Sequence, residues 1–401
     1  MANADLNGAN LEGANLSNAD LGGADLTNAN LIGANLTRAF LQVAKLIGAN
    51  LIGATLIDSS LLVADLSKAE LSGATLTNAT LRGAKLTDAE MREVDLTSAN
   101  LISADMTNAR LDGADLTDAD LRGATLTNAE LSKANLTHAN LSEADLSYAA
   151  LVGTDVTSAR LNYANLTWAY YSPASPPPDP FVAGIRGLQT VVFADGEEIG
   201  LVQLRDLLNR AGLRDLEREA TYAIESGRTW YAIDGWKEDP VRAAEGVFRR
   251  AAFDLSTAYG LHPARALLLI AGLWALLILV YLWPIHLQPR APDSAGIYRV
   301  WPKDRIETAD GRLSVDNPEE VQRLQRGWWA SLGWAAYFSL LSAFHIGFRE
   351  FSVGTWIARI QPRKYSLEPL GWVRVVSGVQ SLFSVYLLAM WALTYFGRPF
   401  Q

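Results

Sequence analysis

The sequence predicts a multidomain protein with a β-solenoid of five-residue repeats, a small, mostly α-helical soluble module and an α-helical membrane domain. Three observations carry this prediction. A five-residue repeat fills the first 170 residues, a proline-rich segment ends it, and two uncharged apolar stretches follow residue 260. Each stretch has the roughly 20 residues that a helix needs to cross a bilayer.

The repeat is built on leucine. From Leu6 to Leu166 every fifth residue is Leu, except at Met91, Met106 and Val156. Ala stands two positions earlier almost throughout, and the residue between Ala and Leu is usually Asp or Asn. A period of five matches neither a helix nor a strand, so the pattern cannot be one regular element.

This Ala-(Asp/Asn)-Leu-x-x pattern over residues 2–170 resembles the pentapeptide-repeat family. The resemblance implies a right-handed quadrilateral β-helix in which four repeats make one coil. Ala and Leu would point inward, while the Asp/Asn position and the two variable positions would face water. With about 4.8 Å between layers, roughly eight coils would form a stiff rod about 40 Å long.

The solenoid region is acidic, and its densest acidic stretch holds Asp112, Asp115, Asp118 and Asp120. Some relatives in the family imitate DNA, which makes mimicry one interpretation. The other is that an outward position rich in Asp and Asn keeps the surface soluble. We expect the second, and no nucleic-acid partner.

The composition excludes several kinds of site. The chain has no Cys and four His, so it has no disulfide or cysteine-based zinc site and few ligands for any other metal. No catalytic constellation is present. We therefore expect no enzyme activity, no cofactor and no metal.

A proline-rich segment, residues 171–180, predicts a semi-rigid linker after the solenoid 1–170. Residues 181–262 predict a soluble, mostly helical connecting module. It would contain a strand at 191–194 with a turn, two amphipathic helices separated by Gly212, and a third after Pro240.

A pore-like membrane domain is predicted for residues 263–401, with spanning helices at 264–286 and 372–397. Tyr281 and Trp283 suit an interfacial aromatic belt. The segment 328–348 either spans as a third helix or is re-entrant, returning to the side it entered. The basic stretch 349–374 favours a third span, because re-entry would place it outside the cell.

Residues 253–401 are similar to the two-helix pore module of the potassium-channel superfamily, with a divergent filter. Gly347 matches the first filter glycine, Phe348 the aromatic residue and Glu350 the acidic residue, and Ile346 precedes that glycine. His345 replaces the threonine and Arg349 the second glycine. The resemblance implies a homo-oligomer, with four copies favoured, and a path for inorganic ions that is not strictly potassium-selective.

A polar stripe marks the last predicted helix. Ser377, Gln380, Ser381 and Ser384 follow i, i+3, i+4, i+7 spacing and so share one helix face. Such a face must contact protein or water, so the stripe either lines a pore or packs against another helix.

The sequence thus predicts an oligomeric ion channel whose solenoid serves as a scaffold or regulatory domain. The alternative is a non-conducting, membrane-anchored protein that docks a protein partner through the solenoid. The first residues lack the features of a signal peptide. We expect a multi-pass protein of a bacterial inner membrane, with lipid as a partner and the N-terminal solenoid in the cytoplasm.

Overall fold

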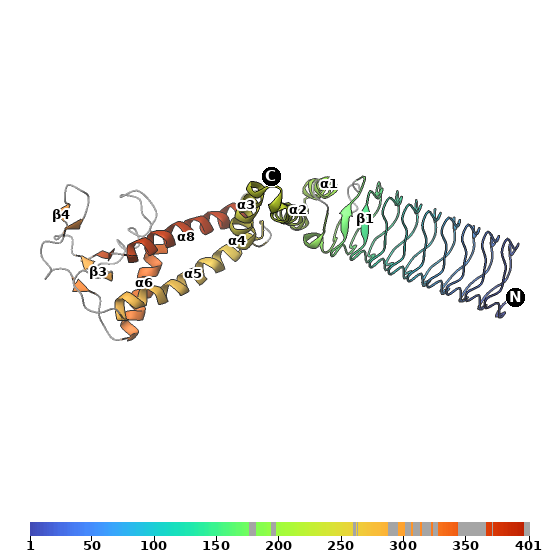
Figure 1. Ribbon diagram of the computed structural model, residues 1–401, viewed down its shortest axis with the longest axis horizontal. Helices are drawn as coiled ribbons and strands as arrows, with labels where there is room; N and C mark the ends of the chain where they lie inside the picture. Colours follow the sequence, from blue (N-terminus) through green and yellow to red (C-terminus); the bar gives the residue numbers. More distant parts are fainter. Residues whose placement is uncertain are drawn as a thin grey trace. The chain divides into compact units, whose positions relative to one another are not determined.

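The computed structural model describes residues 1–175, 182–193, 198–259, 262, 264–287, 296–300, 306–307, 313–314, 322–323, 328–343, 366–370 and 372–396. The chain forms two compact units, Met1–Phe248 and Arg249–Gln401. The first is built on the solenoid and the second on three apolar helices (Figure 1).

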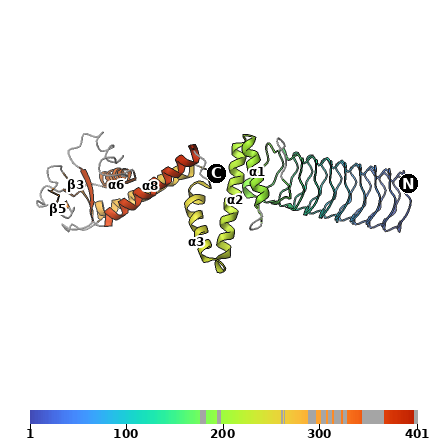
Figure 2. The ribbon, with the colours of Figure 1, turned by 90° about the horizontal axis from the view of Figure 1, so that it is seen from above.

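The first unit begins with stacked coils (Figure 1 and Figure 2), and bridges between them show that they repeat every 20 residues. Asp5 forms a parallel bridge with Asp25, Asp25 with Lys45, and Lys45 with Asp65. Bridges of this register continue on all four sides as far as Ser175. Four five-residue repeats therefore complete one coil, which confirms the predicted β-helix.

Backbone hydrogen bonds join each coil to both neighbours. In the repeat that begins at Ala24, three N–H groups donate to other coils: Asp25 to Ala4 O (2.9 Å), Leu26 to Lys45 O (2.7 Å) and Asn28 to Ile47 O (2.9 Å). A fourth, that of Ala24, donates to Leu21 O at 3.0 Å and closes a tight turn. Only the N–H that follows Leu is left without a backbone acceptor.

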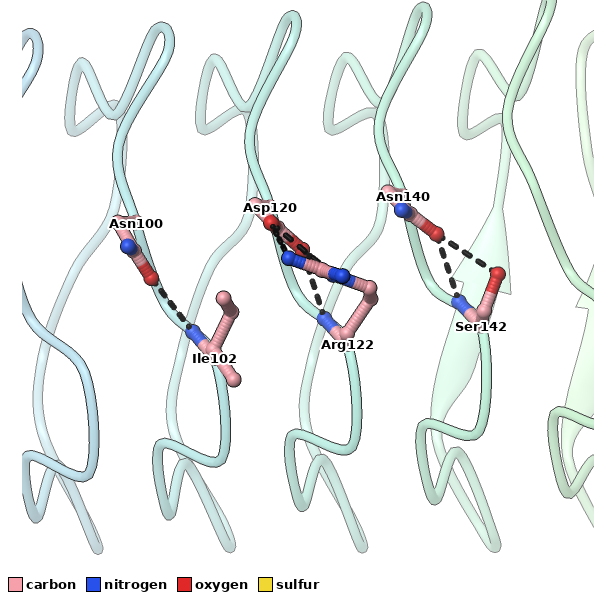
Figure 3. A network of polar contacts seen from close by, with 6 residues as sticks. All are labelled: Asn100, Ile102, Asp120, Arg122, Asn140 and Ser142. Atoms are coloured by element: carbon pink, nitrogen blue, oxygen red, sulfur yellow. Dashed lines mark hydrogen bonds and ion pairs between the residues drawn. The ribbon is translucent and has the colours of Figure 1, made fainter.

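The Asp/Asn position supplies that missing acceptor. Thr27 N donates to Asp25 Oδ1 at 3.1 Å, two residues back. Figure 3 shows the same bond on three successive coils, from Ile102 N to Asn100, Arg122 N to Asp120 and Ser142 N to Asn140. Asp and Asn recur here because a short side chain with an oxygen can cap its own turn.

The second residue after Leu has a positive φ in every repeat, as a type II turn requires. Gly8 has φ 64° and Asn18 has φ 59°. Gly, Asn and Asp tolerate this left-handed conformation best, which explains their frequency at the position. Val43 (φ 59°) and Val63 (φ 56°) adopt it as well, despite their branched Cβ.

Inward Ala and Leu side chains fill the solenoid, and those from Leu21 to Leu166 are buried. Beyond them Tyr171 takes an inward position, where burial raises the pKa of its hydroxyl. The strands β1 (Ala150–Val152) and β2 (Tyr170–Ser172) pair in parallel with the same 20-residue register.

The solenoid continues past the end that the sequence predicts. Tyr170 bridges Val192, and Asn165 bridges Arg186, so the spacing grows to 22 and 21 residues. The inward side chains Val182, Ile185 and Leu188 maintain the core. Residues 171–175 and 182–192 are thus solenoid, where we predicted a linker and a separate module; 176–181 lie outside the described residues. Of the predicted strand at 191–194, the described residues 191–193 form a single bridge, at Val192.

Helices close this end of the solenoid. The hydrophobic core of the coils continues into α1 (Ile199–Arg210) and α2 (Arg214–Asp234) through Leu201, Leu204, Leu208, Ala220 and Ile224. Gly227 lies against Phe193, whose ring atom Cζ would be 2.5 Å from an added Cβ. The helices bury the open last coil, as capping elements of solenoids do. A third helix, α3 (Pro240–Arg249), packs back on α2.

The second unit begins with a π-helical turn at Arg250–Asp254 and the short α4 (Leu255–Thr257). Three longer helices follow, namely α5 (Ala264–Leu282, extended by a π-helical turn at Trp283–Leu287), α6 (Trp328–Ala343) and α8 (Trp372–Phe396). Two stretches, Ala264–Ile285 and Trp372–Leu393, are long and apolar enough to cross a membrane. Their bounds agree closely with the predicted helices.

The connections between these helices contain strands that we did not predict. The central strand β3 (Gly296–Val300) pairs antiparallel with both β6 (Gln322–Arg323) and β7 (Ser366–Leu370). The pair β4 (Ile306–Glu307) and β5 (Leu313–Ser314) forms a second small ladder.

Three helix ends lie beside this sheet. Strand β3 follows α5, β6 precedes α6, and β7 directly precedes α8. The end of α5 and the beginnings of α6 and α8 therefore lie at the same end of the unit, beside the sheet (Figure 1). Helix α6 runs across α5 and α8 instead of alongside them (Figure 1 and Figure 2).

Candidate functional site in the three-helix unit

The polar stripe of α8 faces the other two helices of its own chain. Gln380 is only 2% exposed, Ser381 and Ser384 are buried, and Ser377 is half-buried. Helices α5 and α6 cover this face of α8. The predicted site residues of the stripe thus meet in the interior of the three-helix unit.

Gln380 is the centre of the network. Its Nε2 donates to the carbonyl oxygen of Ser339 at 2.9 Å and to Ser339 Oγ at 3.1 Å. Its Oε1 accepts a hydrogen bond from Tyr281 OH at 2.8 Å. One side chain of α8 therefore satisfies polar groups on both α5 and α6.

Further hydrogen bonds tie the three helices together. Ser377 Oγ donates to Ser342 Oγ at 2.9 Å. Trp274 of α5 donates from Nε1 to the carbonyl oxygen of Ala336 at 3.2 Å, and Ser339 Oγ donates to the carbonyl oxygen of Trp274 at 3.2 Å. Buried polar groups gain little unless they are paired, and most of these are paired within one chain.

Tyr281 corrects one prediction. We placed it in an interfacial aromatic belt, but its side chain is fully buried against Phe338, with ring centroids 5.0 Å apart. Trp283, two residues later, is exposed. Ser339 and Ser342 were not predicted as partners of the stripe, although their i, i+3 spacing on an apolar helix was a readable signal.

The outward faces of α5 and α8 are apolar. Leu382 is 72% exposed, and the other exposed side chains of these faces include Leu268, Leu276, Leu279, Val375 and Phe383. Inside, Ser384 Oγ is buried without a hydrogen-bond partner among the described residues. The three helices therefore enclose polar groups, and the outward surfaces of α5 and α8 are apolar.

The filter-like residues His345, Ile346, Gly347, Phe348, Arg349 and Glu350 lie outside the described residues, so their predicted role stays a prediction. Within the described part of the chain, no group of three or more His, Cys, Asp or Glu side chains could hold a metal ion.

On one side of the solenoid, Asp and Lys alternate from coil to coil between Asp25 and Asp105. Lys45 lies 3.6 Å from Asp25 on the adjacent coil, and Lys85 lies 3.7 Å from Asp65. In the densest acidic stretch, Arg122 approaches Asp120 to 2.7 Å. Exposed pairs like these contribute little stability, but each places a positive charge beside an acidic side chain.

Sequence and structure comparisons identify the origin of these coils. The family model for pentapeptide repeats matches eight copies, covering residues 4–42 and 44–170. HetL, a pentapeptide repeat protein involved in heterocyst differentiation regulation from the cyanobacterium Nostoc, is 34% identical over 49% of this chain and 87% of its own, with a TM-score of 0.40. This chain belongs to the pentapeptide-repeat family.

Other solved structures also align with part of the chain. A thylakoid-lumen protein from Arabidopsis thaliana is 36% identical over 25% of this chain and 68% of its own, with a TM-score of 0.16. QnrB1, a plasmid-mediated fluoroquinolone resistance protein, is 19% identical over 48% of this chain and 95% of its own, with a TM-score of 0.29. A comparison with curated proteins found no match. The family match ends at residue 170, before the three-helix unit.

Proposed function

We propose that this protein is a membrane-anchored interaction scaffold that holds its pentapeptide-repeat solenoid at a membrane surface. One observation carries the proposal: the polar stripe of α8 is paired inside the chain, while the outward faces of α5 and α8 are apolar. An apolar exterior of this kind is favourable in contact with lipid and unfavourable in contact with water.

The dimensions of the two apolar helices support a membrane location. Each stretch has 22 residues, which is about 33 Å of helix and matches a hydrocarbon core of about 30 Å. The core helix of a soluble protein would be mostly covered. Here only 22% of the apolar 18-residue stretch of α5, and 28% of that of α8, is buried within the chain.

The small sheet favours re-entry of α6 over a third span. A ladder of paired strands does not cross lipid, so β3 and β7 belong on one side of the membrane. The chain then enters α6 from that side and must return to it before β7. Three spans would separate the two strands.

This topology leaves two crossings, with the solenoid on the side opposite the sheet. We place the solenoid in the cytoplasm. The basic residues of 349–374 then lie outside, against the positive-inside tendency. That tendency is defined for connections of up to about 60 residues, and the connection 288–371 is longer.

Thiol labelling tests the scaffold proposal, because the chain has no native Cys. In proteoliposomes, Ser381→Cys should resist a water-soluble thiol reagent, and the unmodified protein should pass no more ions than empty vesicles. Ser103→Cys, on an exposed turn of the solenoid, is the matched control and should react. Labelling of Ser381→Cys together with ion flux would overturn the proposal.

An ion channel that is not strictly potassium-selective is the second candidate, and α6 is the observation that favours it. Its described 16 residues, about 24 Å of helix, pack against both α5 and α8 as a re-entrant pore helix would. Lining a pore with the stripe would require α8 to turn Gln380 away from Tyr281 and Ser339.

Conduction also needs several copies, four by the channel resemblance, because one pair of helices encloses no aqueous path. The mass of the protein in detergent tests this requirement. A monomer would remove the channel candidate and leave the scaffold proposal intact. A tetramer with cation flux would favour the channel.

A further inference from the structure

Helix α3 has one face that the protein covers and two that it leaves exposed. Asp239 caps its beginning, accepting hydrogen bonds from Val241 N at 3.1 Å and Arg242 N at 2.9 Å. Its small residues form the covered face: a Cβ added to Gly246 would lie 3.0 Å from Ala232 Cβ on α2. This close packing fixes which sides of the helix remain open.

One open face is apolar. Val241 is 79% exposed and Phe248 is 65% exposed, and at i and i+7 they lie on one stripe, with the exposed Ala244 between them. Val247 is exposed beside this stripe. Large apolar side chains that cluster on a surface helix indicate a binding face, whereas single ones do not.

The neighbouring face is charged, with two Arg residues and the exposed Glu245 between them. Arg242 and Arg249 also stand seven residues apart, and Arg250 follows. Just before the helix, Trp236 is exposed, and Lys237 Nζ lies 5.9 Å from the centre of its ring. An apolar stripe with an aromatic residue, bordered by Arg and Lys, is the pattern of helices that lie in a membrane interface.

The chain that follows α3 reaches the apolar helices directly. Ala252 accepts a hydrogen bond from the hydroxyl of Tyr386 on α8. The apolar stretch of α8 ends at Leu393. Tyr386 is seven residues earlier, a distance of about 10 Å along the helix. If α8 spans a bilayer over this stretch, Ala252 lies about 10 Å inside its end, within the depth of about 5 to 10 Å that interfacial helices reach, and it is four residues after Phe248.

We propose that α3 is an interfacial helix that binds an anionic bilayer surface. Val241, Val247 and Phe248 would enter the acyl boundary, and Arg242 and Arg250 would bind lipid phosphates. This inference rests on the proposed membrane location of α5 and α8. The occupant is lipid because the face is continuous along the chain with a membrane-length helix and carries cations at its border.

Fluorescence of single-cysteine variants of the full-length protein tests the inference. Phe248→Cys, labelled with an environment-sensitive dye, is reconstituted in vesicles of POPC with a minor fraction of POPG. Its emission should shift to the blue, and brominated lipid should quench it severalfold more strongly than aqueous iodide. Val241→Cys provides a second position on the same stripe.

Two control positions distinguish failure of the interfacial-helix proposal from failure of the membrane anchor. Glu245→Cys, exposed on the polar side of the same helix, should be quenched by iodide instead. Leu276→Cys, on the outward face of α5, should be quenched by brominated lipid. If Leu276→Cys is quenched by lipid but Phe248→Cys and Val241→Cys follow Glu245→Cys, the interfacial helix is overturned and the membrane anchor stands.

Three other outcomes also decide. Iodide quenching of Leu276→Cys would overturn the membrane anchor itself. Protection of Phe248→Cys from both quenchers would mean that protein covers the face, which overturns the lipid assignment. Removal of POPG should lower lipid quenching at Phe248→Cys severalfold and leave Leu276→Cys unchanged; equal quenching with and without POPG would overturn the role of anionic lipid.

Discussion

The solenoid and the three-helix unit arrange polar and apolar groups in opposite ways. In the coils, Ala and Leu are buried and Asp or Asn lies at the surface. In the helices, Gln380 and Ser339 are buried and Leu268 and Leu382 are exposed. The coils expose polar groups, as proteins in water do, and the apolar exterior of the helices supports the proposed lipid location.

The two regions also differ in how far their polar partners are separated along the chain. In the solenoid, the Asp or Asn side chain accepts from an N–H two residues later. In the helical unit, Gln380 bonds Ser339 over 41 residues and Tyr281 over 99. Short-range bonding makes the first region readable from its motif, and long-range bonding makes the second depend on tertiary packing.

The largest effect should come from cavities in the solenoid core. Leu86→Ala should lower the free energy of unfolding by about 3 kcal/mol, because the side chain is completely buried in a stack of rigid coils. Its control, Leu276→Ala on the outward face of α5, should cost less than about 1 kcal/mol. Denaturant unfolding in detergent measures both, and equal losses would refute the contrast.

The second effect concerns the buried network. Gln380→Leu should cost about 1 to 2 kcal/mol, because it leaves polar groups of Tyr281 and Ser339 without their partner. Tyr281→Phe should cost less, and the double variant should cost less than the sum of the two. Val379→Leu, on the neighbouring exposed position, is the control. Additive losses would show that the two side chains do not interact.

A smaller effect is expected from the turn caps. Asn100→Ala should destabilise its coil by about 1 kcal/mol, because Ile102 N loses its acceptor. Thr80→Ala changes the same position one coil earlier, where no such bond exists, and should be close to neutral. Hydrogen exchange of the affected coil measures the difference. Similar protection in both variants would contradict the capping role.

The smallest effect should be a gain. Val63→Asn should stabilise the solenoid by about 0.5 kcal/mol, because Asn tolerates the positive φ of this position better than a β-branched residue. Leu62→Asn, at the preceding turn position, lacks a positive φ and should bring no gain. The shift in thermal midpoint between the two variants tests whether the left-handed turn is strained.

The solenoid was largely predictable because each structural requirement lies inside one repeat. Burial of Ala and Leu, the outward Asp/Asn position and the four-repeat coil all follow from the motif and the family resemblance. The left-handed turn position was readable from its Gly and Asn residues, as at Gly8 and Asn18, but was missed. The last coil was not predictable in the same way, since Val182 and Val192 continue it without the five-residue spacing.

The helical unit was predictable only in its parts. Hydropathy located α5 and α8, and periodicity located the stripe of α8. Nothing local indicated that Tyr281 would bond Gln380, or that β3 would pair with β7 across a separation of about 70 residues, because long-range pairing leaves little trace in a single sequence.

The 20-residue coil also makes the solenoid a screw with a fixed pitch. A deletion or insertion of 20 residues would shorten or lengthen the rod by one layer of about 4.8 Å and leave every later face pointing the same way. A change of five residues would turn everything beyond it by a quarter of a revolution. The number of repeats therefore sets both the length of the rod and the direction in which each later face points, and whole coils change the length alone.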